Sequence, residues 1–140
     1  MGHRITGDRQ QGRSNGVGYE KVHVARDDAT RLAHVEVLAD EQKATVISLH
    51  GREVDWFNAQ GVECLRVMSD NGPASVSKAF AKACRILGLR HLRTRPYTPR
   101  TNGKAERFIQ ILCREWAYSM PFQNAEERNR LLPRYLSIYN

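Results

Sequence analysis

Residues 66–73 read RVMSDNGP, and residues 93–110 read RTRPYTPRTNGKAERFIQ. The first stretch closes a short apolar-rich segment, Val62–Met68, which we expect to be a strand buried in a mixed sheet. Asp70 follows this strand directly, at the edge of the sheet where α/β folds place ligands. In the second stretch a loop with two prolines and a glycine precedes a predicted helix, whose first turn holds Glu106. Thirty-five residues separate the two acids.

The chemistry of these two acids depends on whether they converge. Phosphodiester cleavage and exchange commonly use two Mg²⁺ ions flanked by carboxylates. Mg²⁺ prefers oxygen ligands and keeps several of its waters, so few protein carboxylates are needed. An Asp at a strand end and a Glu at a helix start can meet at such a site. Taken alone the pair is a weak signal, because turn Asp and helix-start Glu residues are usually structural.

The segments on either side predict the rest of the fold. Tyr19–Ala25 and Leu32–Leu38 alternate apolar and polar residues and read as an antiparallel hairpin around an Asp-Asp turn. The order of elements predicts an α/β domain with helices packed on a mixed sheet. The other predicted elements are a helix over 40–61, a helix over 74–87 whose first turn takes Pro73, a strand over 89–95, a loop over 96–103, a helix over 104–118 and a last helix capped by Asn124.

Length and composition fit one ordinary globular domain. The chain has 140 residues, of which 41% are hydrophobic and 26% charged. It contains no apolar stretch long enough to cross a membrane and no signal peptide, so we expect no membrane association and a cytoplasmic protein. The three cysteines form no CxxC pair, which favours reduced thiols in apolar segments over a disulfide framework.

The charge is strongly basic, at +7. Such a surplus indicates a polyanionic partner or simply a solvated surface. The run from Arg85 to Arg107 holds several cations and one acid, Glu106. Because this run adjoins the candidate site, we favour DNA phosphates as the partner. The candidate DNA-binding residues before, in and beyond the loop are Arg93, Arg95, Arg100, Lys104, Arg107, Gln110 and Arg114.

Both quoted stretches, with their 35-residue spacing, closely resemble the catalytic core of DDE transposases and retroviral-type integrases. Bacterial insertion-sequence transposases look most similar, and the hairpin VHVARDDATRLAHVEVL and the run CREWAY fit the same family. The resemblance implies an RNase H-like fold with a five-stranded mixed sheet. It implies that Asp70 and Glu106 are two of the catalytic carboxylates, binding Mg²⁺ or Mn²⁺.

The resemblance also assigns roles to residues around the two acids. Asn71 and Gly72 match a tight turn that aims the carboxylate of Asp70 outward. Asn102 and Gly103 match a loop that approaches DNA ahead of the catalytic helix. We therefore add Asn102 and Gly103 to the candidate DNA-binding residues.

One catalytic position of the family has no counterpart. The family's first catalytic Asp lies on a strand upstream of the hairpin, a strand that would precede Met1. We do not expect Asp8, Asp27 or Asp28 to replace it. A two-metal site would then lose its bridging ligand, leaving one weakly held Mg²⁺. The missing strand is central in the sheet, so its loss leaves unpaired edges and favours association or aggregation.

We accordingly expect a flexible arm over 1–18 and an integrase-type core over 19–140 that is incomplete at both ends. The first hypothesis for function is Mg²⁺-dependent DNA cleavage and strand transfer acting on transposon ends and target DNA, with the fragment inactive alone. The second is a non-catalytic remnant that binds DNA or multimerises with itself or a full-length transposase. A nuclease of the same fold is a third.

Overall fold

The computed structural model describes residues 20–94 and 103–140. The predicted arm over 1–18, Asp8 and most of the predicted loop over 96–103 lie outside these residues. The chain forms two compact units, one of Met1–Ala39 with Lys104–Asn140 and one of Asp40–Gly103. No helix of the described ranges is long and apolar enough to cross a bilayer.

The first unit is built on the hairpin that the sequence predicts. Strands β1 (Lys21–Arg26) and β2 (Ala33–Leu38) pair antiparallel, with Val22 opposite Val37 and Val24 opposite Val35. These valines share one face of the hairpin, because side chains alternate across a strand. The turn is held by Asp27, whose Oδ2 accepts hydrogen bonds from the backbone N–H of Thr30 (2.6 Å) and from its hydroxyl (2.7 Å).

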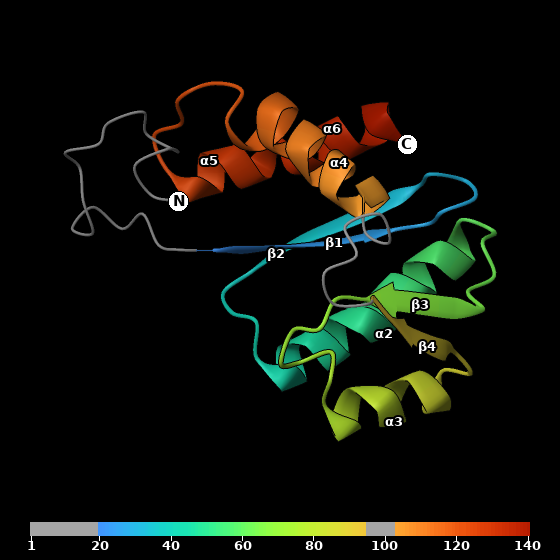
Figure 1. Cartoon of the computed structure of the whole chain (residues 1–140). Helices are drawn as coiled ribbons and strands as arrows, with labels where there is room; N and C mark the ends of the chain where they lie inside the picture. The colour runs from blue at the N-terminus through green and yellow to red at the C-terminus, as the bar shows by residue number, and fades with distance from the viewer. Residues whose placement is uncertain (1–19, 95–102) are drawn as a thin grey trace. The chain divides into compact units, whose positions relative to one another are not determined.

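Helices cover the valine face of this hairpin (Figure 1). They are α4 (Gly103–Leu112), a π-helical turn η2 (Cys113–Ala117), α5 (Ala125–Arg130) and α6 (Leu132–Tyr139). Ala33 and Val35 pack with Phe108, Leu112 and Trp116 in one buried cluster. The helix predicted over 104–118 is therefore an α-helix that widens at its end, where Tyr118 N–H donates to the carbonyl of Cys113 (2.8 Å). In this widened turn the adjacent residues Trp116 and Ala117 are both buried.

The last predicted helix begins where expected and is interrupted once. Asn124 caps α5, its side chain accepting from Glu127 N–H at 2.8 Å, and the Glu127 carboxylate accepts from Gln123 N–H at 2.8 Å. Pro133 falls in the first turn of α6, where a missing N–H costs nothing, so a new helix starts at Leu132.

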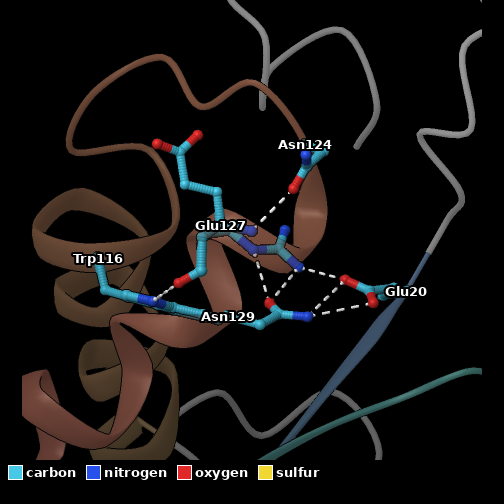
Figure 2. Close-up of polar contacts among 6 residues, drawn as sticks. Glu20, Trp116, Asn124, Glu127 and Asn129 are labelled. Atoms are coloured by element: carbon cyan, nitrogen blue, oxygen red, sulfur yellow. Dashed lines mark hydrogen bonds and ion pairs between the residues drawn. The ribbon is translucent and has the colours of Figure 1, made fainter.

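A buried arginine ties α5 to the start of β1. The side chain of Arg128 is 0% exposed, and its Nη2 lies 2.5 Å from Glu20 Oε2. Asn129 bridges the pair: its Oδ1 accepts from Arg128 Nη2 (2.8 Å) and its Nδ2 donates to Glu20 Oε2 (3.1 Å). Trp116 Nε1 donates to the carbonyl of Arg128 at 3.0 Å (Figure 2). The guanidinium also lies 5.2 Å from the Trp116 ring centroid, as a cation–π contact.

The second unit joins two helices to a parallel strand pair (Figure 1). Strands β3 (Arg66–Ser69) and β4 (Arg90–Arg93) pair in parallel register, with Ser69 opposite Arg93. Helix α2 (Lys43–Ala59) buries Leu49, Val54 and Phe57, and the chain turns out of it at Gly61, whose φ is +79°. Helix α3 (Lys78–Ile86) packs Phe80 and Cys84 against Leu89.

The start of α3 was predicted wrongly. Pro73 does not occupy its first turn: Ser77 is the N-cap, and its hydroxyl accepts from Phe80 N–H at 3.1 Å. The Ser77 hydroxyl accepts a hydrogen bond from a free N–H of the first helical turn, and a proline side chain has no acceptor to do so. The helix therefore starts at Lys78, four residues after the predicted Ala74. Val76 therefore precedes the helix, and it is 44% exposed.

Within the described residues the strands form two separate two-stranded sheets, β1–β2 and β3–β4. Large apolar side chains on and beside β3 are exposed, including Leu65 at 65% and Met68 at 54%. A two-stranded pair is marginally stable alone, so both sheets depend on their helices.

Candidate functional site

Asp70 lies where the sequence predicts, immediately after β3 and exposed to solvent. Its Oδ1 accepts a hydrogen bond from the backbone N–H of Gly72 at 2.9 Å. A Cβ added at residue 72 would lie 3.0 Å from that same oxygen, tighter than an ordinary van der Waals contact. Glycine at this position therefore leaves room for the carboxylate of Asp70 to fold back onto the turn.

The loop carrying Asp70 is fixed to the end of β4. The side-chain amide of Asn71 donates to the carbonyl of Thr94 (2.9 Å), and Thr94 N–H donates to the carbonyl of Ser69 (3.0 Å). The Ser69 hydroxyl lies 2.7 Å from His91 Nε2 and 3.2 Å from the carbonyl oxygen of Asp70. These contacts restrain the backbone on both sides of the candidate carboxylate.

Glu106 also lies where the sequence predicts, exposed in the first turn of α4. Phe108 and Leu112 of the same helix are each 1% exposed and pack against the hairpin. Because these positions follow the helical period, the buried face of α4 leaves Glu106 on the solvent side. The core of the first unit thus sets the orientation of this carboxylate.

Lys104, predicted to bind DNA, contacts the hairpin turn instead. Its Nζ lies 2.5 Å from Asp28 Oδ1, in an ion pair whose side chains are 70% and 78% exposed. Arg26 Nη1 donates to the backbone carbonyl of Lys104 at 3.4 Å. The turn predicted to be only structural therefore touches the start of the helix that carries Glu106.

The other predicted DNA-binding residues divide into four groups. Arg107 and Gln110 are exposed on α4. Arg114 lies on the π-helical turn and pairs with Glu115 at 3.4 Å. Arg93 is exposed at the end of β4, and Gly103 begins α4. Arg95, Arg100 and Asn102 lie outside the described residues.

Sequence reasoning missed a cavity of about 390 Å³ between α3 and β4, which we call the α3–β4 cavity. Its polar lining comes from Lys78 and Arg85 of α3, His91 and Arg93 of β4, and two serines; Val76, Ala81, Cys84 and Leu89 complete it. Lys78 and Arg85 are seven residues apart in a helix, and His91 and Arg93 are two apart in a strand. These spacings place each pair on one face, which is the signal that could have indicated the cavity.

The electrostatics around this cavity are positive. Burial lowers the pKa of the His91 imidazole below its ordinary value, and the charges of Arg93 and His50 lower it further. Phe80 separates the two histidines, with its ring centroid 5.1 Å from His50 and 5.0 Å from His91. His91 is thus held as a neutral hydrogen-bonding partner of Ser69 near neutral pH.

The described residues contain no group of three or more His, Cys, Asp or Glu side chains that could hold a metal ion. The candidate donor set is two exposed carboxylates, Asp70 and Glu106. Hard oxygen ligands of this kind suit Mg²⁺ or Mn²⁺, which bind through one or two carboxylates and keep several waters. The side-chain chemistry of each of these two acids therefore suits a hydrated divalent cation.

Comparison with known families gives two matches, both described as integrase core domains. One family model matches residues 1–99 and a second matches residues 87–140.

Two curated relatives are each 35% identical over 91 residues. One is an uncharacterised protein of Caenorhabditis elegans; the match covers 65% of this chain and 7% of that protein. The other is the retrovirus-related Pol polyprotein from transposon TNT 1-94 of Nicotiana tabacum, with 61% of this chain and 6% of the relative covered. The chain thus spans less than a tenth of either relative.

Two solved structures share the fold. One is a chain of the simian T-cell lymphotropic virus intasome in complex with the PP2A regulatory subunit B56 gamma, at 26% identity and a TM-score of 0.59, covering 86% of this chain and 36% of that chain. The other is the catalytic core domain of BIV integrase, at 24% identity and a TM-score of 0.60, covering 72% of this chain and 63% of that chain. The second match shows the RNase H-like fold alone.

Proposed function

The chain belongs to the integrase core family, and from this premise we propose that it acts in Mg²⁺-dependent DNA cleavage and strand transfer, with Asp70 and Glu106 as its catalytic carboxylates. The observation that carries the proposal is the placement of the two acids. Asp70 is exposed at the carboxyl end of β3, and Glu106 is exposed in the first turn of α4. Both positions leave a carboxylate without a packing role.

The roles of the residues follow from their placement. Asp70 and Glu106 would be the protein ligands of one hydrated divalent cation, which would supply Lewis-acid polarisation of a phosphoryl oxygen. The Gly72 N–H steadies one oxygen of Asp70 and leaves the other for the ion. The nucleophile is water for cleavage and a DNA 3′-hydroxyl for strand transfer, and attack in line needs no covalent intermediate.

DNA is the proposed partner, through transposon ends and target. Arg107, Gln110 and Arg114 lie exposed on α4 and η2, a few residues after Glu106. The two arginines neutralise backbone phosphates, and the Gln110 amide donates hydrogen bonds to them. Arg93, Arg95, Arg100, Asn102, Gly103 and Lys104 complete the proposed contact set. Lys104 must leave Asp28 to take part, at a small cost because both partners are exposed. We also propose self-association or assembly with a longer transposase.

A second function, DNA binding or multimerisation without chemistry, is favoured by one observation. The described residues contain no group of three or more His, Cys, Asp or Glu side chains that could hold a metal ion. On this alternative the basic surface binds DNA and the two acids have no catalytic role.

A nicking assay distinguishes the two functions. The 140-residue chain is incubated with supercoiled plasmid and Mn²⁺ or Mg²⁺, beside Asp70→Asn, Glu106→Gln and the matched control Asp55→Asn, an exposed acid on α2. The fragment alone is expected to be close to inactive, so the proposal predicts only residual metal-dependent nicking, which both test variants abolish and the control retains. Nicking that survives Asp70→Asn refutes the site. DNA binding with no nicking under any metal supports the second function.

A further inference from the structure

The stretch that forms α3 and β4 is unusually rich in cations. Residues 71–94 contain five Lys or Arg residues and no acid. Three of them line the α3–β4 cavity, namely Lys78, Arg85 and Arg93, whereas Lys82 and Arg90 do not. All five side chains are exposed. Within residues 20–94 and 103–140, none of the three lining cations forms an ion pair with an acid.

An uncompensated cluster of this kind is costly unless it is solvated or meets an anion. Like charges repel, and their mutual repulsion falls when a phosphate or other anion lies among them. The cavity adds hydrogen-bonding groups to the charges, since Ser75, Ser77 and His91 also line it. No acidic side chain contributes to the lining, so the whole rim carries one sign of charge.

We infer that the α3–β4 cavity is a contact surface for the phosphate backbone of duplex DNA. The inference rests on the proposed function for the choice of DNA, and it assigns Lys78, Arg85 and His91, which the proposed contact set does not include. Seven residues of α-helix separate Lys78 from Arg85, or about 10 Å of rise. That spread exceeds one phosphate group and matches several successive phosphates of a strand, which recur every 3.4 Å or so along the axis. A polymeric anion therefore fits better than a single small one.

The contact is expected to be independent of sequence. The non-polar lining consists of small or aliphatic side chains, and no Phe, Tyr or Trp ring lines the cavity to stack on a base. Long cationic side chains on the rim recognise phosphate charge rather than base edges. The surface therefore positions DNA and does not select a site.

The chain offers a matched pair of variants on the same two elements. Lys78→Gln with Arg93→Gln removes one lining charge from α3 and one from β4. Lys82→Gln with Arg90→Gln removes one charge from each element outside the cavity. Both doubles lower the net charge by two, and all four positions are exposed, so long-range electrostatics and folding are affected alike.

The readout is the anisotropy of a labelled 30-base-pair duplex bound by the 140-residue chain over a series of NaCl concentrations. The lining double is expected to weaken binding at least tenfold at 100 mM NaCl and to reduce the slope of log affinity against log salt by about 1.8, at roughly 0.9 per phosphate contact. The control double is expected to change affinity less than threefold. Arg85→Gln against Lys82→Gln repeats the comparison within α3. Equal effects of the two doubles overturn the inference.

Failure of the cavity assignment can be distinguished from failure of the proposed catalytic function. If the two doubles behave alike while Asp70→Asn abolishes nicking, the cavity assignment fails and the catalytic proposal stands. If the lining double alone loses affinity while nicking ignores Asp70→Asn, the cavity assignment stands and the catalytic one fails. Inorganic phosphate added at constant ionic strength gives a last check: displacement of the duplex at millimolar phosphate would contradict a polymeric ligand and point to a small anion.

Discussion

Glu20→Gln should destabilise the first unit far more than a surface change of the same kind. The substitution removes the negative charge 2.5 Å from Arg128, whose side chain is 0% exposed. Truncating one partner of a fully buried pair costs about 3–5 kcal/mol, because the other charge stays buried without compensation. Glu20 is 31% exposed, and Asn129 and the Trp116 ring continue to contact the guanidinium. Discounting for that exposure and those partners leaves an expected cost of about 2 kcal/mol.

Urea unfolding followed by tryptophan fluorescence measures this cost. In a Trp56→Phe background the emission comes from Trp116, which donates to the carbonyl of Arg128 and so reports on the first unit (Figure 2). With a slope of about 2 kcal/mol per molar urea, a 2 kcal/mol loss lowers the midpoint by about 1 M. The matched control is Glu126→Gln, which removes an exposed pair with Arg130 on the same helix, at 3.6 Å.

The control should change the free energy of unfolding by no more than about 0.5 kcal/mol. A double variant tests the pair itself. Arg128→Met combined with Glu20→Gln should cost less than the sum of the two singles, because no charge is then left buried. Equal midpoints for Glu20→Gln and Glu126→Gln, or strictly additive costs in the double variant, would refute the reasoning.

Three further predictions concern the second unit. Gly72→Ala places a Cβ 3.0 Å from Asp70 Oδ1 and should weaken Mn²⁺ binding severalfold in a titration. The control Gly51→Ala, whose Cβ meets no atom within 4 Å, should leave Mn²⁺ binding unchanged, and equal effects of the two variants would contradict the role of the turn. Because burial lowers the pKa of His91, the unfolded chain binds more protons than the folded one, and the free energy of unfolding should fall as the pH drops below about 6.5. His91→Gln should flatten this fall in the urea midpoints, and a pH profile unchanged by the substitution would contradict the role of His91. Burial also raises the pKa of Cys84, which is 1% exposed, so its thiol should react with Ellman's reagent only on unfolding; rapid reaction in native buffer would contradict this.

Much of the fold could be predicted from local patterns in the sequence. The alternation of apolar and polar residues predicted the antiparallel hairpin, and the Asn124 cap predicted the start of α5. Asp70 and Glu106 were located correctly, at a strand end and in a helix first turn. These features depend on neighbours a few residues apart, which a single sequence displays.

Features that depend on distant partners could not be predicted. The burial of Arg128 requires Glu20, more than a hundred residues earlier, so its charge alone pointed to the surface. The π-helical turn buries Trp116 and Ala117 together, which helical periodicity does not anticipate. The pairing of Lys104 with Asp28 likewise joins two segments that no spacing rule connects.

The α3–β4 cavity was missed for a related reason. Its cations come from two elements whose contact is set by the packing of Phe80 and Cys84 on Leu89. The sequence displayed the charges of Lys78 and Arg85 but not their position beside β4. The predicted DNA-binding residues lie around the loop over 96–103 and on the helix that follows it. Arg93 was grouped with them, and its place in the lining of the cavity was not predicted.

The central claim is that Asp70 and Glu106 bind one and the same cation, and Mn²⁺ affinity measured by electron paramagnetic resonance tests it most directly. Asp70→Asn, Glu106→Gln and the double variant are titrated beside the unaltered chain. If the two carboxylates share the ion, each single change should weaken binding about tenfold or more, and the double change should be little worse than either single one. Singles that leave the affinity unchanged, or losses that simply add in the double variant, would contradict the shared site.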